Sequence, residues 1–404
     1  MGAPLEGIKV LEVANWLAVP AAATLMADMG AQVIKVEPPE GDPWRNFQPS
    51  ALGMGSAFPG NPMFEVDNRG KRSIGININL LEGQQAVRRL TLQADVFLTN
   101  LVPVRRERYG LTYPELSKSN PGLIYLGFTG YGNAGPERDR LGFDYAAFWA
   151  RSGIMSLVGE PGETPPLPRT GMGDHATAPL LLAGVLAALY ERINSGLGQE
   201  ISGSLLNTGL WVLGSDLQAA LVSRRNPERT PRDSAPNPIW NVYRAGDDKW
   251  LLLVMPTPDP YWPRLCQAID RPELAEDLRY ATIQGRKEHC RELIAILDRT
   301  FASASRQEWG SLLDAHGLIW APVQSLEEVM ADPQVRANDF LTTVEHPTFG
   351  AYEAIETPLK FGRSEVGVRG PAPAAGQHTE EVLLEAGYTW EDLTRLRELG
   401  VFGR

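Results

Sequence analysis

Short apolar segments alternate with helix-like segments over the first 130 residues. Five apolar segments predict strands, at 8–13, 32–36, 73–77, 94–98 and 123–127. Between them, residues 20–29 and 81–92 have the periodicity of helices. This alternation predicts right-handed βαβ units and a parallel sheet, as in a Rossmann-like α/β domain. Ligands bind such sheets at the carboxyl ends of the strands. The functional loops are therefore expected after Val13, Val36, Leu98 and Gly127.

The longest apolar helix is predicted over residues 177–190, with Leu, Val or Ala on every face. Such a helix is typically buried all round. Its length of about 14 residues is too short to span a bilayer. We therefore expect no membrane-spanning segment.

The pattern changes beyond residue 222. Residues 223–238 are rich in Arg, Pro and Asn and lack apolar periodicity, as in a linker. Residues 240–244 and 250–254 then predict a hairpin, and helical patterns follow. We expect a large domain over 1–222, a linker over 223–238, an inserted smaller α+β domain over 239–325, and a return to the large domain over 326–404.

Composition narrows the class of protein. A net charge of −11 argues against nucleic acid as a partner. The two cysteines, Cys266 and Cys290, have no metal-type spacing and suit a reducing cytoplasm. The five histidines are scattered, so no metal site is expected. The N-terminus lacks a basic region followed by an apolar one, which agrees with a cytoplasmic location.

Several common active-site motifs are absent from the sequence. The first strand is not followed by Gly-x-Gly-x-x-Gly, so the fingerprint of a dinucleotide site is missing. No P-loop motif occurs, and no Gly-x-Ser-x-Gly of a serine hydrolase.

Asp174 stands at the start of the long apolar helix, directly after Gly171, Met172 and Gly173. Glycines let the backbone approach a ligand closely, and their N–H groups could stabilise an oxyanion. A carboxylate near a helix N-terminus gains about 0.3–1 kcal/mol from the helix dipole, so Asp174 is expected to stay ionised. Two interpretations remain open: a helix N-cap or a nucleophile.

Basic residues cluster in three segments near predicted strands. The first cluster is the segment 68–72. The second contains Asn100, Arg105, Arg106 and Arg108. The third contains the segment 130–132 together with Arg138 and Arg140. Solvated surface charge is one explanation. In an acidic protein, however, three clusters at one edge of a sheet would suit an anionic, phosphate-bearing ligand. We expect such a pocket.

Eight stretches of the chain, in order, resemble one known family. They are 4–12, 30–39, 68–74, 94–100, 142–144, 173–174, 196–199 and 376–383. Together they resemble the class III (CaiB/BaiF-type) coenzyme A transferases, which include formyl-CoA transferase and α-methylacyl-CoA racemase. Three runs, 14–20, 142–151 and 171–175, are most similar to transferases for aryl-lactates and other 2-hydroxy acids.

The resemblance implies a CoA-transferase (EC 2.8.3) in which Asp174 is the covalent nucleophile. Coenzyme A would pass from an acyl-CoA donor to a carboxylic acid acceptor through an aspartyl-CoA thioester. Coenzyme A is then part of the substrates, and no permanently bound cofactor is expected. The family forms interlocked homodimers. The positions that match its coenzyme A contacts, or lie near them, are Trp16, Ala18, Lys71, Arg72, Asn100 and Arg108.

The chain also departs from its relatives. Pro38 replaces a basic residue, which leaves Lys35 or an arginine to take its place. Leu17 and the lack of a glycine-rich flap over 239–256 argue against formate and oxalate. Phe143 replaces the racemase histidine and cannot carry a proton, which disfavours a racemase or isomerase. A non-catalytic acyl-CoA-binding protein is a third alternative. Trp16, Phe143, Phe148 and Trp149 could line an apolar acyl pocket, or form plain core.

Overall fold

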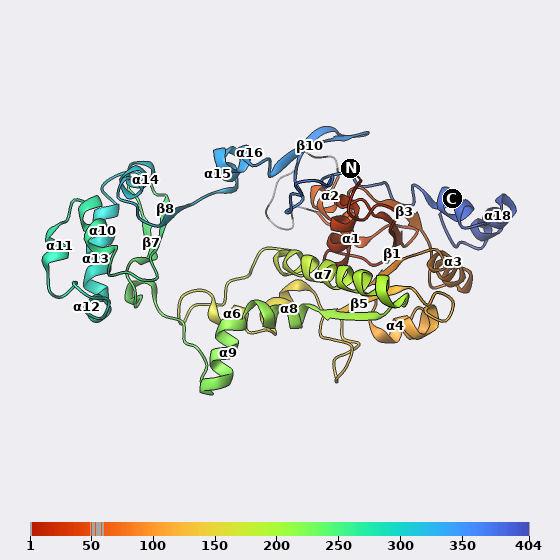
Figure 1. Cartoon of the computed structure of the whole chain (residues 1–404), viewed down its shortest axis with the longest axis horizontal. Helices are drawn as coiled ribbons and strands as arrows, with labels where there is room; N and C mark the ends of the chain where they lie inside the picture. The colour runs from red at the N-terminus through yellow and green to blue at the C-terminus, as the bar shows by residue number, and fades with distance from the viewer. Residues whose placement is uncertain (1, 49, 51–52, 54–57, 59, 404) are drawn as a thin grey trace. The chain divides into compact units, whose positions relative to one another are not determined.

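The structure, a computed structural model, describes residues 2–48, 50, 53, 58 and 60–403, and it divides into two compact units (Figure 1). The first unit contains the residues up to Ser156, Leu167–Arg225 and the residues from Asp339 onward. The second contains Leu157–Pro166 and Asn226–Asn338. Compared with the predicted inserted domain, the second unit gains the segment 157–166 and extends to residue 338.

A six-stranded parallel sheet forms the centre of the first unit, with strand order β3-β2-β1-β4-β5-β6. Its strands are β1 (Lys9–Val13), β2 (Gln32–Glu37), β3 (Arg72–Gly75), β4 (Val96–Thr99), β5 (Ile124–Thr129) and β6 (Glu200–Ser204). The predicted parallel α/β sheet is confirmed. Most residues of β1 to β5 are buried, because helices cover both faces of the sheet.

Helices cover the sheet on both faces. Along the chain the first unit has α1 (Ala18–Asp28), α2 (Pro62–Asn68), α3 (Leu81–Thr91), α4 (Pro103–Tyr109), α5 (Tyr113–Leu116), the π-helix η3 (Tyr145–Ala150), α7 (Met172–Ser195), α8 (Leu205–Val212), α9 (Gly214–Ser223), α17 (Thr379–Glu385) and α18 (Trp390–Glu398). Helices α1 and α7 lie side by side in one core cluster (Figure 1). Helices α3, α17 and α18 contribute to the cluster on the opposite face. Three further elements are the short helices η1 (Pro43–Asn46) and α6 (Ile154–Leu157) and the hairpin β10 (Leu341–His346) with β11 (Gly350–Ile355).

Helix α7 differs from its prediction in length and burial. It has 24 residues, and only one of its faces is buried. Ile193 is 80% exposed and Tyr190 72% exposed, so the expectation of burial on every face is wrong for this chain by itself. Of the helices described, α7 alone is long and apolar enough to cross a membrane, contrary to the predicted length. Its buried face, however, packs along α1 like that of a core helix.

The second unit has a three-stranded antiparallel sheet, ordered β7-β8-β9, packed against helices around its own core. Its strands are β7 (Trp240–Arg244), β8 (Trp250–Val254) and β9 (Trp320–Val323). Its helices are η4 (Arg232–Ser234), α10 (Trp262–Ala268), α11 (Glu273–Glu276), α12 (Ile283–Glu288), α13 (Cys290–Phe301), α14 (Arg306–Ala315), α15 (Leu326–Ala331) and α16 (Pro333–Ala337). The hairpin β7–β8 has the predicted bounds.

Candidate active site

Asp174 lies in the first turn of α7, inside the helix rather than at its cap position. The N-cap is Gly171, which has φ +79°, a value that only glycine adopts without strain. Asp174 is 8% exposed. The interpretation of Asp174 as an N-cap is therefore wrong, because the helix begins three residues earlier than a cap at this position requires.

A second carboxylate, Asp144, binds the backbone at the start of α7. The Gly173 N–H donates a hydrogen bond to Oδ2 of Asp144 over 3.3 Å. Asp144 is 4% exposed and directly precedes the π-helix η3. A Cβ on Gly173 would lie 2.2 Å from Oδ1 of Asp144, so the close approach needs glycine. One of the N–H groups that we expected to stabilise an oxyanion is thus already engaged.

The environment of Asp174 favours its protonated form. Burial raises its pKa from 3.8 to about 7, and the negative charges of Asp144 and Asp67 act in the same direction. His175 opposes this effect. A pKa of about 7 means that Asp174 is only partly ionised at neutral pH, because the effect of desolvation exceeds the stabilisation from the helix terminus.

His175 points toward Asp67, at the end of α2. Its Nε2 lies 2.8 Å from Oδ1 of Asp67, and Oδ2 of Asp67 accepts a hydrogen bond from Nε1 of Trp44 at 3.0 Å. Sequence reasoning missed Asp67 altogether. It lies in a seven-residue helix that was not predicted, and no local motif marks it.

The loop after β1 is held in an unusual conformation. Trp16 has φ +69°, a rare value for a large side chain. Its N–H donates to Oδ1 of Asp42 over 3.2 Å, and Asn100 exchanges two hydrogen bonds with the backbone of Asn15, at 3.2 and 2.6 Å. Ala18 is buried in the first turn of α1. The structure therefore brings Trp16, Ala18 and Asn100 together at the carboxyl edge of the sheet.

Two lysines considered for phosphate binding are buried. The Nζ of Lys35 contacts Glu12 at 2.9 Å and Asp42 at 2.8 Å. The Nζ of Lys71 contacts Glu12 at 2.7 Å and the carbonyl oxygens of Pro20 and Asp67, both at 2.8 Å. Neither side chain is exposed. Burial lowers the pKa of Lys71 to about 8, although Glu12 opposes the shift.

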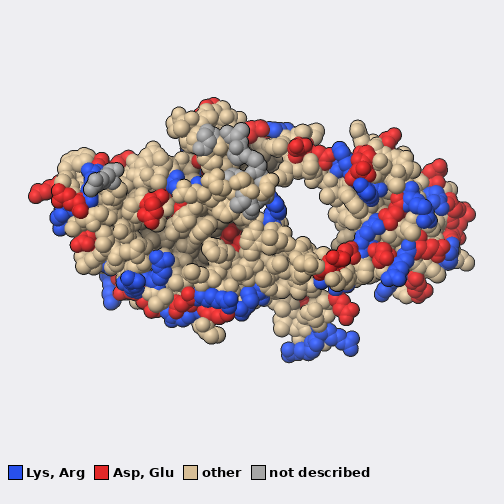
Figure 2. Space-filling model, turned by 180° about the vertical axis from the view of Figure 1, so that it is seen from behind, with Lys and Arg blue, Asp and Glu red and all other residues tan. Residues whose placement is uncertain are grey.

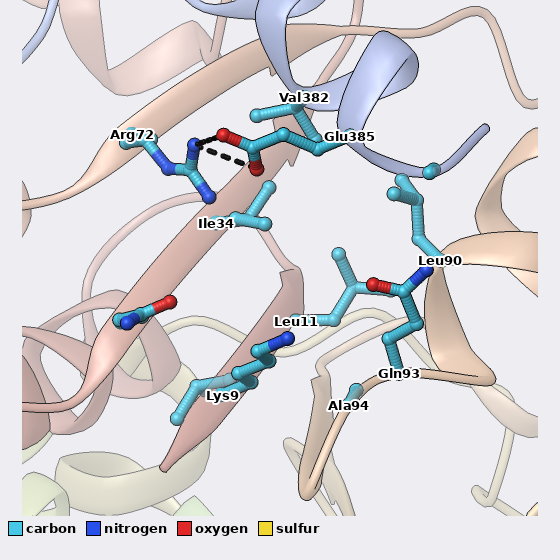
Figure 3. Close-up of a pocket in the computed structure, with 12 residues that line it drawn as sticks. Lys9, Leu11, Ile34, Arg72, Leu90, Gln93, Ala94, Val382 and Glu385 are labelled. Atoms are coloured by element: carbon cyan, nitrogen blue, oxygen red, sulfur yellow. Dashed lines mark hydrogen bonds and ion pairs between the residues drawn. The ribbon is translucent and has the colours of Figure 1, made fainter. Parts of the chain in front are cut away.

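Arg72 lies at the opposite end of the sheet from the expected site. It begins β3, and the segment 68–72 enters that strand at its amino end, whereas ligand loops leave strands at their carboxyl ends. Its guanidinium pairs with Glu385 at 2.8 Å and Glu381 at 3.0 Å. Figure 3 shows Arg72 turned toward Glu385 at a pocket of about 60 Å³ that Lys9 also lines. This pocket, which Arg72 lines and Lys71 does not, is too small for a coenzyme, and the contacts of Lys71 and Arg72 with coenzyme A stay predictions.

The remaining basic segments follow β4 and β5. Arg106 is buried and donates to the carbonyl oxygen of Phe128 at 2.8 Å, which is a structural role. Arg138 pairs with Glu107 at 2.5 Å, and Arg140 pairs with Glu137. Basic and acidic side chains are interleaved on the face seen in Figure 2. The expected concentration of positive charge is thus largely neutralised.

Arg105 and Arg108 on α4 are exposed, and neither forms an ion pair with the residues that the structure describes. Arg105 lines a cavity of about 270 Å³ at the carboxyl ends of β1 to β4, together with Asn15 and Asn77. This is where parallel α/β sheets bind ligands.

The aromatic side chains divide into surface and core. Phe143 is 53% exposed and meets Trp16 edge to face, with ring centroids 5.2 Å apart. Phe148 is buried in the core beneath Gly173. Trp149 packs against Phe148 at the edge of that core. Within the described residues, no group of three or more potential metal ligands occurs.

Comparison with known proteins identifies the family to which this chain belongs. The model of CoA-transferase family III matches residues 5–379. The chain is 33% identical to (R)-2-hydroxy-4-methylpentanoate CoA-transferase of Clostridioides difficile, over 98% of each chain. It is also 33% identical to cinnamoyl-CoA:phenyllactate CoA-transferase of Clostridium sporogenes, over 97% of this chain and 96% of that one. A CaiB/BaiF family protein from Brucella suis has a similar structure, with a TM-score of 0.85 and 29% identity over 96% of this chain and 100% of that chain. The chain therefore belongs to CoA-transferase family III and is a CoA-transferase.

Proposed function

We propose that Asp174 is the nucleophile of this CoA-transferase. Its carboxylate attacks the thioester carbonyl of the acyl-CoA donor, which forms a mixed anhydride and releases the CoA thiolate. The thiolate attacks the aspartyl carbonyl, which forms an aspartyl-CoA thioester and releases the donor acid. The acceptor acid repeats these steps in reverse and leaves as its own CoA thioester. The observation that carries the proposal is the buried Asp174 carboxylate at the glycine-flanked start of α7 in a chain of this family.

Intact mass spectrometry after mixing with an acyl-CoA tests this mechanism. The expected result is a gain in mass that corresponds to bound coenzyme A and is removed by hydroxylamine. Asp174→Asn should abolish the adduct, whereas Asp216→Asn, at an exposed aspartate of α9, should retain it. If cinnamoyl-CoA, succinyl-CoA and formyl-CoA all support turnover without forming an adduct, the mechanism is excluded.

We propose that coenzyme A binds at the carboxyl edge of the sheet, near Trp16, Ala18, Asn100 and Arg108. The cavity beside Arg105 and the unpaired state of Arg108 among the described residues support this placement. Arg108→Gln is expected to raise the KM for the acyl-CoA donor about tenfold, the effect of losing one charged contact to phosphate. Arg72→Gln is the matched control at the opposite end of the sheet, and an equal effect there would contradict the placement.

We infer that the acceptor is a monocarboxylic acid with an apolar body. Among the residues that the structure describes, the charged groups that act on Asp174 are Asp144, Asp67 and His175, and none of them is a lysine or arginine that could pair with a second carboxylate. A Cβ on Gly171 would lie 2.8 Å from Leu17, so apolar side chains border this turn. The two relatives described above, named for a branched hydroxy acid and for phenyllactate, agree with this class. Phenyllactate should exceed succinate as an acceptor by at least tenfold in kcat/KM, and the reverse order would refute the inference.

We also propose a cytoplasmic homodimer. Large apolar side chains are exposed on the chain by itself, among them Ile193 on α7, Trp211 on α8 and Val222 on α9. Exposed apolar side chains of this size are often covered by a partner, and the interlocked dimer of the family would supply one. The two cysteines, Cys266 and Cys290, are unpaired, as is usual in a reducing compartment.

A further inference from the structure

The imidazole of His175 is fixed by a buried carboxylate. Its Nε2 lies 2.8 Å from Oδ1 of Asp67, whose side chain is 1% exposed. Because an ionised carboxylate can only accept, Nε2 carries the hydrogen of this bond. Trp44 donates to the other oxygen of Asp67 and fixes the carboxylate in turn. The ring is therefore oriented from α2 while its backbone belongs to α7.

Among the described residues, three carboxylates act most strongly on this imidazole. Asp67 faces it from α2, Asp174 precedes it on α7, and Asp144 lies just before η3. Burial lowers the pKa of His175, but the hydrogen bond and charge of Asp67, together with the other two carboxylates, outweigh burial and raise it. The imidazolium form is favoured as a result.

We propose that His175 is a positioning residue whose positive charge, held in place by Asp67, favours the anionic form of the adjacent Asp174 carboxylate against the effects of burial and of the neighbouring carboxylates. His175 transfers no atom in the reaction. Without the charge of His175, Asp174 would be buried beside two negative groups, which favours its protonated form. A protonated carboxyl could not attack a thioester. The inference rests on the proposed function, because an anionic Asp174 matters for catalysis only if Asp174 is the nucleophile.

The pH dependence of adduct formation separates this role from a structural one. With cinnamoyl-CoA as the probe, the rate for wild-type protein should rise with pH as Asp174 ionises. His175→Gln keeps a donor for Asp67 but removes the charge, so the midpoint should move up by about one pH unit or more. At pH 7 the rate should fall about fivefold, and it should recover at higher pH. His316→Gln, at a half-buried histidine of the second unit whose Nδ1 lies 2.9 Å from the carbonyl oxygen of Leu312 in α14, should keep the wild-type midpoint.

An unchanged midpoint in His175→Gln, with or without a lower rate, would overturn the inference. A wild-type protein that forms no adduct at any pH would instead overturn the proposed function.

A second measurement requires neither an acyl-CoA donor nor a variant of His175. The protein has five histidines, so their ring signals can be followed by NMR in histidine-labelled protein. Coupling between two charges is reciprocal, so Asp174→Asn should lower the pKa of His175 by about one unit. Asp216→Asn should leave the pKa of His175 unchanged. A His175 that titrates identically in wild-type and Asp174→Asn protein would refute the electrostatic role.

Discussion

At the scale of single residues, the ionisation of Asp174 is decided by its neighbours more than by the helix that carries it. A helix N-terminus stabilises a carboxylate by about 0.3–1 kcal/mol. A pKa that rises from 3.8 to about 7 corresponds to roughly 4 kcal/mol in the opposite direction, at about 1.4 kcal/mol per unit. The effect of burial beside Asp144 and Asp67 on the pKa of Asp174 is therefore larger than the effect of the helix N-terminus.

Asp144→Asn should make Asp174 ionise more readily. The asparagine keeps an oxygen for the Gly173 N–H but removes a negative charge that raises the pKa of Asp174. The midpoint of CoA-adduct formation should move down by about one pH unit, the opposite direction from His175→Gln. The pH profile of the rate measures this shift, and Asp216→Asn is the control. A midpoint that moves up would contradict this electrostatic account.

The buried Asp174 should cost stability at alkaline pH. Its folded pKa lies above the unfolded value of 3.8, so the folded state binds more protons between about pH 4 and pH 7 and loses stability as pH rises through this window. Asp174→Asn should therefore raise Tm by roughly 4 °C or more near pH 8 and have little effect near pH 4. Thermal denaturation followed by circular dichroism at both pH values measures this. An equal change in Tm at both would show that the charge is not the cause.

At the scale of elements, the start of α7 depends on its contact with the π-helix η3. Phe148 from η3 packs beneath Gly173, and Asp144 precedes the same element. Helix α7 continues through Pro179, which lies inside the helix beyond its first turn and therefore removes one i→i−4 backbone hydrogen bond, the one to the carbonyl oxygen of His175. The π-helix was not visible in the sequence, since no local motif distinguishes it from an ordinary helical turn.

Gly173→Ala tests that contact. The new Cβ would lie 2.2 Å from Oδ1 of Asp144 and 2.4 Å from Cγ of Phe148. The clash should lower the free energy of unfolding by about 1–3 kcal/mol and reduce activity, in spite of the helix propensity of alanine. Urea denaturation and kcat/KM measure the two effects. Gly214→Ala, at a helical glycine of α9 with open space around it, should be neutral or stabilising, and equal losses in both variants would contradict the account.

At the scale of the whole molecule, exposed apolar side chains on α7, α8 and α9 argue for a partner chain. Ile193 is 80% exposed and Trp211 76% exposed. Helix α7 was predicted to be buried all round from its composition, and a second copy of the chain would complete that burial.

Light scattering should give twice the chain mass of 44.3 kDa. Ile193→Arg should weaken the dimer and lower activity, because a charge would be buried in an apolar contact. Leu278→Arg, at a leucine that is 90% exposed in the second unit, is the control and should change neither mass nor activity. A wild-type protein that is monomeric and fully active would exclude the proposed dimer.

Local patterns in the sequence determined the strands, the order of helices and the position of Asp174. Periodicity and glycine placement are short-range signals, so β1 to β5, α3 and the hairpin β7–β8 could be predicted. The same signals failed where boundaries depend on packing. Helix α7, predicted from residue 177 to 190, extends from Met172 to Ser195. The helix α2, which carries Asp67, was missed.

Tertiary structure alone decided which charges face each other. Asp67, Asp144 and His175 come from α2, the start of η3 and α7, and no spacing in the sequence links them. It also showed that Lys71 forms a buried ion pair with Glu12 and Arg72 a surface ion pair with Glu385, because a basic residue in the sequence does not reveal its partner or the end of the sheet on which it lies. Proximity and desolvation depend on the fold, so the sequence could identify the candidate nucleophile but not its ionisation.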